Sequence, residues 1–132
     1  AVQPVHVMAL RPNNWFINAA RLERVREAWR HGGRGELPPV LVTEIGGALS
    51  LIDGHARTYA AYERGETCIR VLVRDLEQIE GSKALYRHIH REGPARGIET
   101  IADLAERIVG PETHARLWAG YCEKWLAEHG AE

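Results

Sequence analysis

The sequence predicts an α/β fold, in which a small mixed sheet is followed by a helical extension. Within residues 1–75, short β-branched runs alternate with patterns that place apolar residues along one side of a helix. From residue 76 onward the signals turn helical. We therefore expect a core at 1–75 and an extension at 76–132 that packs on it, so that the chain forms one compact unit.

The core begins with a predicted strand and helix. Residues 5–10, VHVMAL, indicate a short strand, which the RPNN turn of residues 11–14 ends. Asn18 is expected to cap a helix that runs to about His31, and Gly32-Gly33 to end it. The apolar residues of this helix share one side: Leu22, Val25, Ala28 and Trp29.

A hairpin, a second helix and a last strand complete the predicted core. Aliphatic runs at 40–45 and 48–52 flank Gly46-Gly47, a favoured pair for a two-residue turn. A helix is expected over roughly 56–64, with the next glycine as its stop. Residues 67–75 alternate apolar and polar side chains, as a strand does.

The extension is expected to be helical. Ser82 is a candidate cap for KALYRHIH, and a loop is expected at 91–97. Thr100 and Asp103 form an approximate capping box before a predicted helix at 101–109. After Gly110-Pro111, a last helix carries a wide apolar stripe that must dock on the rest of the molecule: Leu117, Trp118, Tyr121, Cys122, Trp125 and Leu126.

Charge and composition narrow the classes of function. The net charge is −1, with ten Lys/Arg against seven Asp/Glu in residues 1–74 and seven against eleven in residues 75–132. Neither half has the strongly basic balance of a duplex DNA binder, so a small anionic ligand is favoured over DNA. No stretch approaches the roughly 18 apolar residues of a membrane span. Two distant cysteines without metal-ligand spacing favour a reduced, cytoplasmic setting, and the oligomeric state stays open.

The stretch LSLIDGHARTYAAYERG (49–65) predicts a phosphate site where a strand becomes a helix. Gly54 permits a tight turn, and the free N–H groups of the first helical turn, which includes Ala56 and Thr58, attract an anion. Arg57 can grip a phosphate with two donors, and His55 can donate to a phosphate oxygen. Asp53 can hold Mg²⁺ or orient an attacking hydroxyl. The alternative is an ordinary turn that only joins strand to helix.

Residues 5–74 resemble the ParB/sulfiredoxin superfamily. The matching features, in order, are the RPN-type turn, the P-V-x-V strand, the glycine-turn hairpin and the G-x-x-R helix entry with two alanines behind it. The resemblance implies a partly open mixed sheet of the ParB/sulfiredoxin type. It also implies a nucleotide or small phosphorylated molecule at the helix entry, with ATP or another nucleotide plus Mg²⁺ as cofactor.

Three relatives within this superfamily frame the function. ParB proteins carry Gly-Glu-Arg-Arg, of which this chain keeps Gly54 and Arg57, and sulfiredoxin has a nucleophilic cysteine where His55 stands. Free serine kinases carry Asp-Gly-His-His-Arg, which differs only at Ala56. That resemblance makes Asp53 and His55 the catalytic candidates of an ATP-dependent phosphotransferase. Where those kinases place a glutamate base, this chain has Asn13 and Asn14.

Residues in and just after the RPNN turn are further candidates for the site. Asn13, Asn14 and Trp15 are candidates for a pocket wall, although Trp15 and Phe16 can equally pack against the first helix. Arg21 and Arg24 are interpreted as ordinary surface pairs with nearby glutamates. The sequence thus favours nucleotide or phosphate binding, with phosphotransfer as the enzymatic form. The alternatives are a non-enzymatic DNA-associated or regulatory module of ParB type, and a domain whose turn has no ligand.

Overall fold

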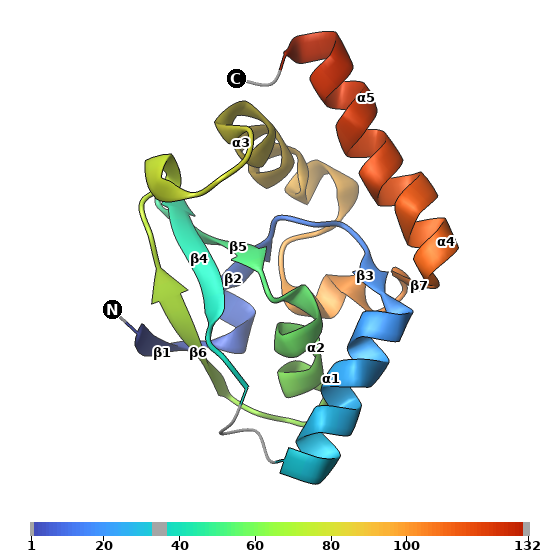
Figure 1. Cartoon of the computed structure of the whole chain (residues 1–132). Helices are drawn as coiled ribbons and strands as arrows, with labels where there is room; N and C mark the ends of the chain where they lie inside the picture. The colour runs from blue at the N-terminus through green and yellow to red at the C-terminus, as the bar shows by residue number, and fades with distance from the viewer. Residues whose placement is uncertain (1, 33–36, 131–132) are drawn as a thin grey trace.

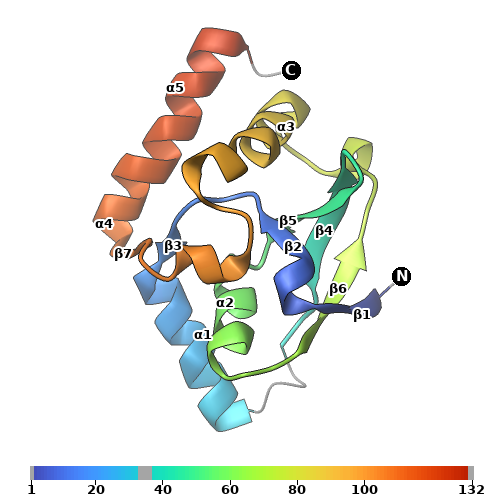
Figure 2. The same ribbon diagram turned by 180° about the vertical axis from the view of Figure 1, so that it is seen from behind.

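The computed structural model describes residues 2–32 and 37–130. Its described part confirms the α/β class: five strands form a mixed sheet in the order β1-β6-β4-β5-β2, and helices cover one side and one end of it (Figures 1 and 2). The strands of this sheet are β1 (Val2–His6), β2 (Leu10–Pro12), β4 (Val40–Ile45), β5 (Ala48–Asp53) and β6 (Cys68–Val73). No helix in the described ranges is long and apolar enough to cross a bilayer.

The sheet curls because its two edge strands are joined by a very short connection. β1 pairs antiparallel with β6 at one edge, and β2 pairs parallel with β5 at the other. Only a 3₁₀ turn at Val7–Ala9 links them. A flat sheet of this width would separate its edges by about 19 Å, whereas this link spans at most about 14 Å. The two edges must therefore approach each other.

The prediction of one strand over residues 5–10 is wrong, because the chain crosses there from one edge of the sheet to the other. Residues Val7–Ala9 leave the sheet, and the Met8 main-chain N–H donates to His6 Nδ1 at 3.1 Å. Val7 is buried at this corner. An uninterrupted strand would keep the chain at one edge, so the 3₁₀ turn is what carries it to the other. Pro12, expected in a turn, instead ends β2.

The hairpin and both core helices are confirmed. Gly46 and Gly47 have φ of 60° and 86°, as the two-residue turn between β4 and β5 requires. Helix α1 (Ala19–Gly32) begins at Asn18, whose Oδ1 accepts from the Ala20 N–H at 2.9 Å. Its buried face holds Leu22 and Trp29, whereas Ala28, expected on that face, is exposed. Gly33 lies outside the described residues.

Helix α2 (His55–Glu63) is the central helix of the domain. Six of its residues are buried, and it lies between α1 and the sheet (Figure 1). Two small residues, Ala60 and Ala61, are almost completely buried, which permits the close approach that an AA pair predicts. A bidentate pair from Arg26 to Glu63, at 2.6 and 2.8 Å, joins α1 to the end of α2. The last residue of α2 is therefore attached to α1.

The extension is less helical than predicted. Helix α3 (Lys83–Glu92) begins at Ser82, whose Oγ accepts from the Leu85 N–H, as expected. The predicted helix at 101–109 is wrong: the capping box at Thr100 opens only a 3₁₀ turn, Ile101–Leu104. The chain then forms the short strand β7 (Ile108–Val109), which pairs parallel with β3 (Ile17–Asn18). The predicted loop at 91–97 contains a further 3₁₀ turn, Pro94–Arg96.

The last helical segment changes its winding along its length. It comprises α4 (Pro111–His114), a π-helical turn (Ala115–Ala119) and α5 (Gly120–His129). Part of its apolar stripe docks as expected, with Trp118 and Tyr121 against the Trp15 ring at centroid distances of 5.3 and 5.2 Å, whereas Leu117, expected in the stripe, is exposed. Figure 2 shows this segment along the outside of the molecule next to α3. The β3–β7 pairing and this aromatic contact are thus two of the places at which the extension is attached to the core.

Candidate functional site

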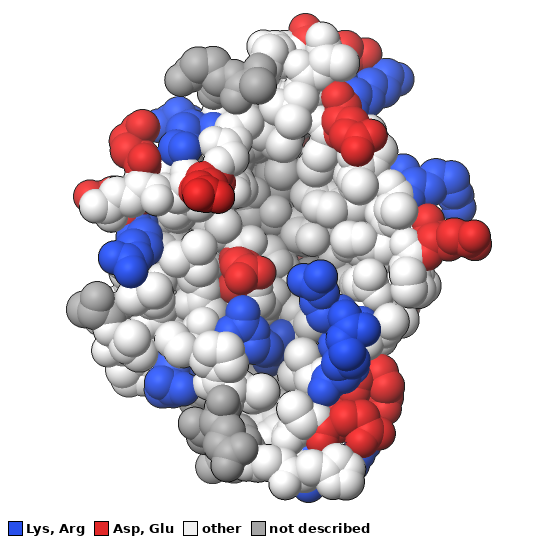
Figure 3. Space-filling view, viewed as in Figure 1, with Lys and Arg blue, Asp and Glu red and all other residues white. Residues whose placement is uncertain are grey.

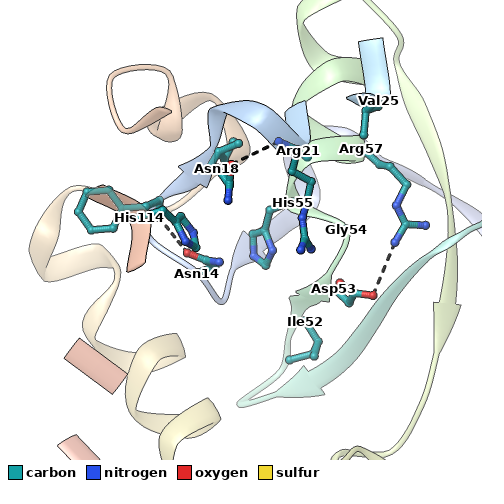
Figure 4. Close-up of a pocket in the computed structure, with 13 residues that line it drawn as sticks. Asn14, Asn18, Arg21, Val25, Ile52, Asp53, Gly54, His55, Arg57 and His114 are labelled. Carbon is teal, nitrogen blue, oxygen red and sulfur yellow. Dashed lines mark hydrogen bonds and ion pairs between the residues drawn. The ribbon is translucent and has the colours of Figure 1, made fainter. Parts of the chain in front are cut away.

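A pocket of about 280 Å³ opens at the point where α2 begins (Figure 4). Its walls come from four parts of the chain: the β3–α1 junction, the end of β5, the first turn of α2, and α4. Among the residues that line it are Asn14, Asn18, Arg21, Asp53, Gly54, His55, Ala56, Arg57 and His114. The predicted turn and residues far from it in sequence therefore meet in one cavity.

Gly54 sets the geometry of the turn. Its φ of 113° lies in the left-handed region, and a Cβ there would be 2.4 Å from Val40 Cγ1. The Gly54 carbonyl accepts from both the main-chain N–H and the hydroxyl of Thr58, each at 2.9 Å. Among the residues that the structure describes, no side chain is seen to cap α2, whose N-cap is Gly54, and its first turn holds no acidic residue. The first-turn N–H groups thus have no side-chain acceptor, while the Thr58 hydroxyl is already bonded and Thr58 does not line the pocket.

Arg57 is held beside the pocket by main-chain carbonyls. Its Nη1 donates to the carbonyls of Pro38 at 2.7 Å and Pro39 at 3.0 Å, and its Nη2 lies 3.6 Å from an Asp53 carboxylate oxygen. Burial lowers the pKa of Arg57, the Asp53 carboxylate opposes that effect, and Arg21 adds to it. Nη1 is thus committed to the main chain, and a two-donor contact with a phosphate, as expected from the sequence, would have to use Nε and Nη2.

Arg21 and His114 are the pocket residues that sequence reasoning missed. Arg21 lies in the first turn of α1 and His114 ends α4, yet both line the pocket with His55 (Figure 4). Arg21 lowers the pKa of Arg57 and of His114, as a nearby positive charge does. A signal for Arg21 was present in the sequence: a cation in a first helical turn opposes the helix dipole, so it calls for an explanation.

His55 is buried and held by a main-chain contact. Its Nε2 lies 3.1 Å from the Asn13 main-chain nitrogen, which donates to it. Burial, followed by the proximity of His114, lowers the pKa of His55 to about 3, and contact with the Leu51 main chain opposes this only partly. The imidazole is therefore neutral at physiological pH, and any contact it makes with an anion is that of a neutral ring.

Of the three expected wall residues, only Asn14 lines the pocket. Its Oδ1 accepts from the Phe16 N–H at 2.9 Å. Asn13 is buried instead, and its Nδ2 donates to Ser50 Oγ and to the Tyr86 carbonyl, both at 2.9 Å. The expectation that Asn13 and Trp15 form the wall is corrected: Asn13 bridges β2 to β5 and α3, and Trp15 packs in the aromatic contact with the last helix.

Asp53 is the only carboxylate among the described residues that line the pocket. Its side chain is 68% exposed, and it also lines a second, more open hollow of about 480 Å³ with Arg74, Glu80 and Tyr86. No group of three or more His, Cys, Asp or Glu side chains in the described ranges could hold a metal ion. Because Mg²⁺ is usually bound through one or two carboxylates and the phosphates of its ligand, Asp53 fits as a single protein ligand.

The surface around the pocket is unevenly charged. Figure 3 shows basic side chains over the first turns of α1 and α2, next to one acidic side chain and beside a hollow of uncharged residues. The lining residues account for this pattern, since Arg21 and Arg57 face a single carboxylate, Asp53. An anion that enters the hollow therefore meets more positive than negative charge.

Comparisons with known proteins return structural neighbours only. No protein-family model matches the chain, and no curated protein matches it. Its neighbours among solved structures include sulfiredoxin from Arabidopsis thaliana, at 20% identity and a TM-score of 0.48, covering 67% of this chain and 96% of that one. A C-terminally truncated ParB from Caulobacter crescentus complexed with CTP-gamma-S, a chromosome-partitioning protein, has 18% identity and a TM-score of 0.47.

The chain spans only part of its other neighbours. It covers 53% of the Caulobacter ParB, which covers 73% of this chain in return. A protein from Agrobacterium tumefaciens, at 20% identity and a TM-score of 0.48, matches 57% of this chain over 38% of its own length. ParB and sulfiredoxin, two of the three relatives named in the sequence analysis, are thus among the structural neighbours.

Proposed function

We propose that the pocket binds the phosphate group of a nucleotide or of a small phosphorylated molecule. The observation that carries the proposal is the meeting of two arginines, each from the first turn of a helix. Arg21 comes from α1 and Arg57 from α2, and neither first turn contains an acidic residue. Since a cation is unfavourable at the positive end of a helix, two such cations in one cavity favour a bound anion.

The main-chain geometry supports the same proposal. Gly54 turns the chain so that α2 starts at the pocket, and no side chain caps its first turn. Ala56 lines the cavity and lets a ligand approach the main chain closely. Uncapped N–H groups at a helix start bind phosphate readily, and charge-assisted hydrogen bonds of this kind contribute about 1.5–3 kcal/mol each.

Asp53 supports phosphotransfer as the enzymatic form of this function. It lies between the pocket and the second hollow, so it can face both the phosphate of one ligand and the hydroxyl of another. When Mg²⁺ accompanies the nucleotide, Asp53 is the residue to hold it, and the metal would neutralise phosphate charge. The acceptor would then lie beside Arg74 and Tyr86.

Calorimetric titration with ATP, ADP and CTP, each with and without Mg²⁺, tests the proposal. We expect binding of at least one nucleotide, and Arg21→Gln should weaken it about 10- to 100-fold because one charge-assisted contact is lost. Arg24→Gln is the matched control, since Arg24 is exposed on the same helix and does not line the pocket. Nucleotide binding that is absent, or equal in both variants, would refute the proposal.

One further variant tests the metal-binding role of Asp53, and a DNA-binding measurement tests the alternative function. Asp53→Asn should preserve nucleotide binding without metal but remove the gain in affinity that Mg²⁺ gives. If nucleotide binding is absent and the chain instead binds duplex DNA with a steep salt dependence, the non-enzymatic DNA-associated module is the better interpretation.

A further inference from the structure

His114 reaches the pocket from a part of the chain that the predicted core does not include. It ends α4, which directly follows β7, and β7 pairs with β3 through Ile17–Ile108 and Asn18–Val109. The Ile17 N–H also donates to the Arg107 carbonyl at 3.0 Å. Since β3 leads straight into α1, this pairing fixes His114 opposite Arg21 across the cavity.

The winding of the helix at His114 is also unusual. The π-helical turn Ala115–Ala119 begins at the next residue. Such turns are rare and occur frequently at functional sites, because they reposition the side chains that flank them. In this chain the turn begins directly after the pocket residue His114 and contains Trp118, which packs against Trp15.

We propose that His114 is the titratable ligand-binding residue of the pocket, and that its imidazole takes up a proton from solvent when a dianionic phosphoryl group binds. The proposal rests on the proposed function and deepens it. It specifies that the pocket prefers a dianionic ligand, and it assigns part of the binding of that ligand to a residue of the extension.

The charges around His114 explain the proton uptake. Burial lowers the pKa of His114, Arg21 lowers it further, and contact with the Phe16 main chain partly opposes them. Arg57 and Asp53 line the same cavity from α2 and β5. A dianion placed between Arg21 and His114 reverses this balance, because it screens the arginine and attracts a second positive charge. His55 faces the same cavity but is held by the Asn13 main chain.

Sulfate is the sharpest probe, because it stays a dianion across the working pH range whereas a phosphate itself titrates near pH 6. For the wild-type chain we expect the sulfate Kd to tighten several-fold from pH 8 to pH 6, toward the limit of about tenfold that a rise of one pKa unit on binding gives at still lower pH. His114→Gln should bind more weakly at pH 6 and lose this pH dependence. His31→Gln, whose side chain is 80% exposed on α1, is the control and should behave as wild type.

A second measurement uses the unmodified chain, so that its result does not depend on whether the His114→Gln variant folds. NMR titration of the His114 ring should show its pKa rise when sulfate is saturating, with no comparable change at His31. If the wild type binds ADP but the His114 titration does not move, this inference is overturned while the proposed function stands. If neither ADP nor sulfate binds, the proposed function fails and this inference fails with it.

Discussion

Replacement of Gly54 by alanine tests how the β5–α2 turn is built. The new Cβ would lie 2.4 Å from Val40 Cγ1 and 2.7 Å from Val40 Cβ. A change of Val40 rotamer moves Cγ1 but leaves the contact with Val40 Cβ, because that atom is fixed by β4. The turn or the strand must therefore move, and Val40 is completely buried in the core.

The expected cost has two parts. A left-handed conformation in a non-glycine residue costs about 1–2 kcal/mol, and overpacking in a close-packed region adds about 1–3 kcal/mol. Gly54→Ala should therefore lower the free energy of unfolding by about 2–5 kcal/mol. Gly97 has a φ of 79° and no atom within 4 Å of an added Cβ, so Gly97→Ala should show only the first part.

Urea unfolding followed by tryptophan fluorescence measures both variants. The difference between them isolates the contact with Val40, and we expect Gly54→Ala to be less stable than Gly97→Ala by about 1–3 kcal/mol. With a typical m-value this is a lower midpoint by roughly 1 M or more. Equal destabilisation of the two variants would refute the conclusion that β4 closely restrains the turn.

Three further outcomes concern the α1 cap, the buried histidines and the α1–α2 ion pair. Asn18→Ala removes the acceptor of the Ala20 N–H and should lower the free energy of unfolding by about 1 kcal/mol in urea melts, and no loss would contradict the capping role. Burial lowers the pKa of His55 to about 3 and of His90 to about 4, from 6.5, so the unfolded chain takes up these protons first as the pH falls. Stability should therefore drop below pH 6.5, by about 1.4 kcal/mol per pH unit for each histidine, and His55→Gln should reduce that slope in a denaturation series. Arg26→Gln breaks the partly exposed pair with Glu63 and should cost no more than about 1 kcal/mol, whereas a much larger loss in a thermal melt would show that the pair is buried in solution.

The parts of the fold that follow from neighbouring residues were predictable. The β4–β5 hairpin, the Asn18 cap of α1 and the Ser82 cap of α3 each depend on a few adjacent residues, and the structure confirms all three. Residues 101–109 carry the same kind of local signal for a helix, yet β7 forms within them. It forms because it pairs with β3, which lies about 90 residues earlier in the chain. A pairing between such distant segments leaves no periodic pattern in either one.

The residues of the candidate site also fall into those that a local motif predicts and those that only the tertiary structure brings in. Residues 53–57 form a continuous motif, so their place at a strand-to-helix turn could be predicted. Arg21 and His114 join them only through tertiary structure, and their residue types are common on solvated helices. Trp15 could not be placed, since its partners Trp118 and Tyr121 belong to a helix whose docking site the sequence does not specify.

The π-helical turn at Ala115–Ala119 makes the last helix sensitive to its length. Such a turn holds one more residue than the corresponding stretch of α-helix, and each residue of an α-helix advances the side chains by about 100°. If the same residues wound as an ordinary α-helix, the extra residue would rotate Tyr121 and Trp125 by about 100°, away from Trp15 and His88. Deletion of the exposed Ala119 should therefore let the segment wind as an α-helix with Tyr121 and Trp125 still facing the core, whereas insertion of a residue there should rotate them away from it. The number of residues after His114, and not only their identity, determines which side of the C-terminal helix meets the core.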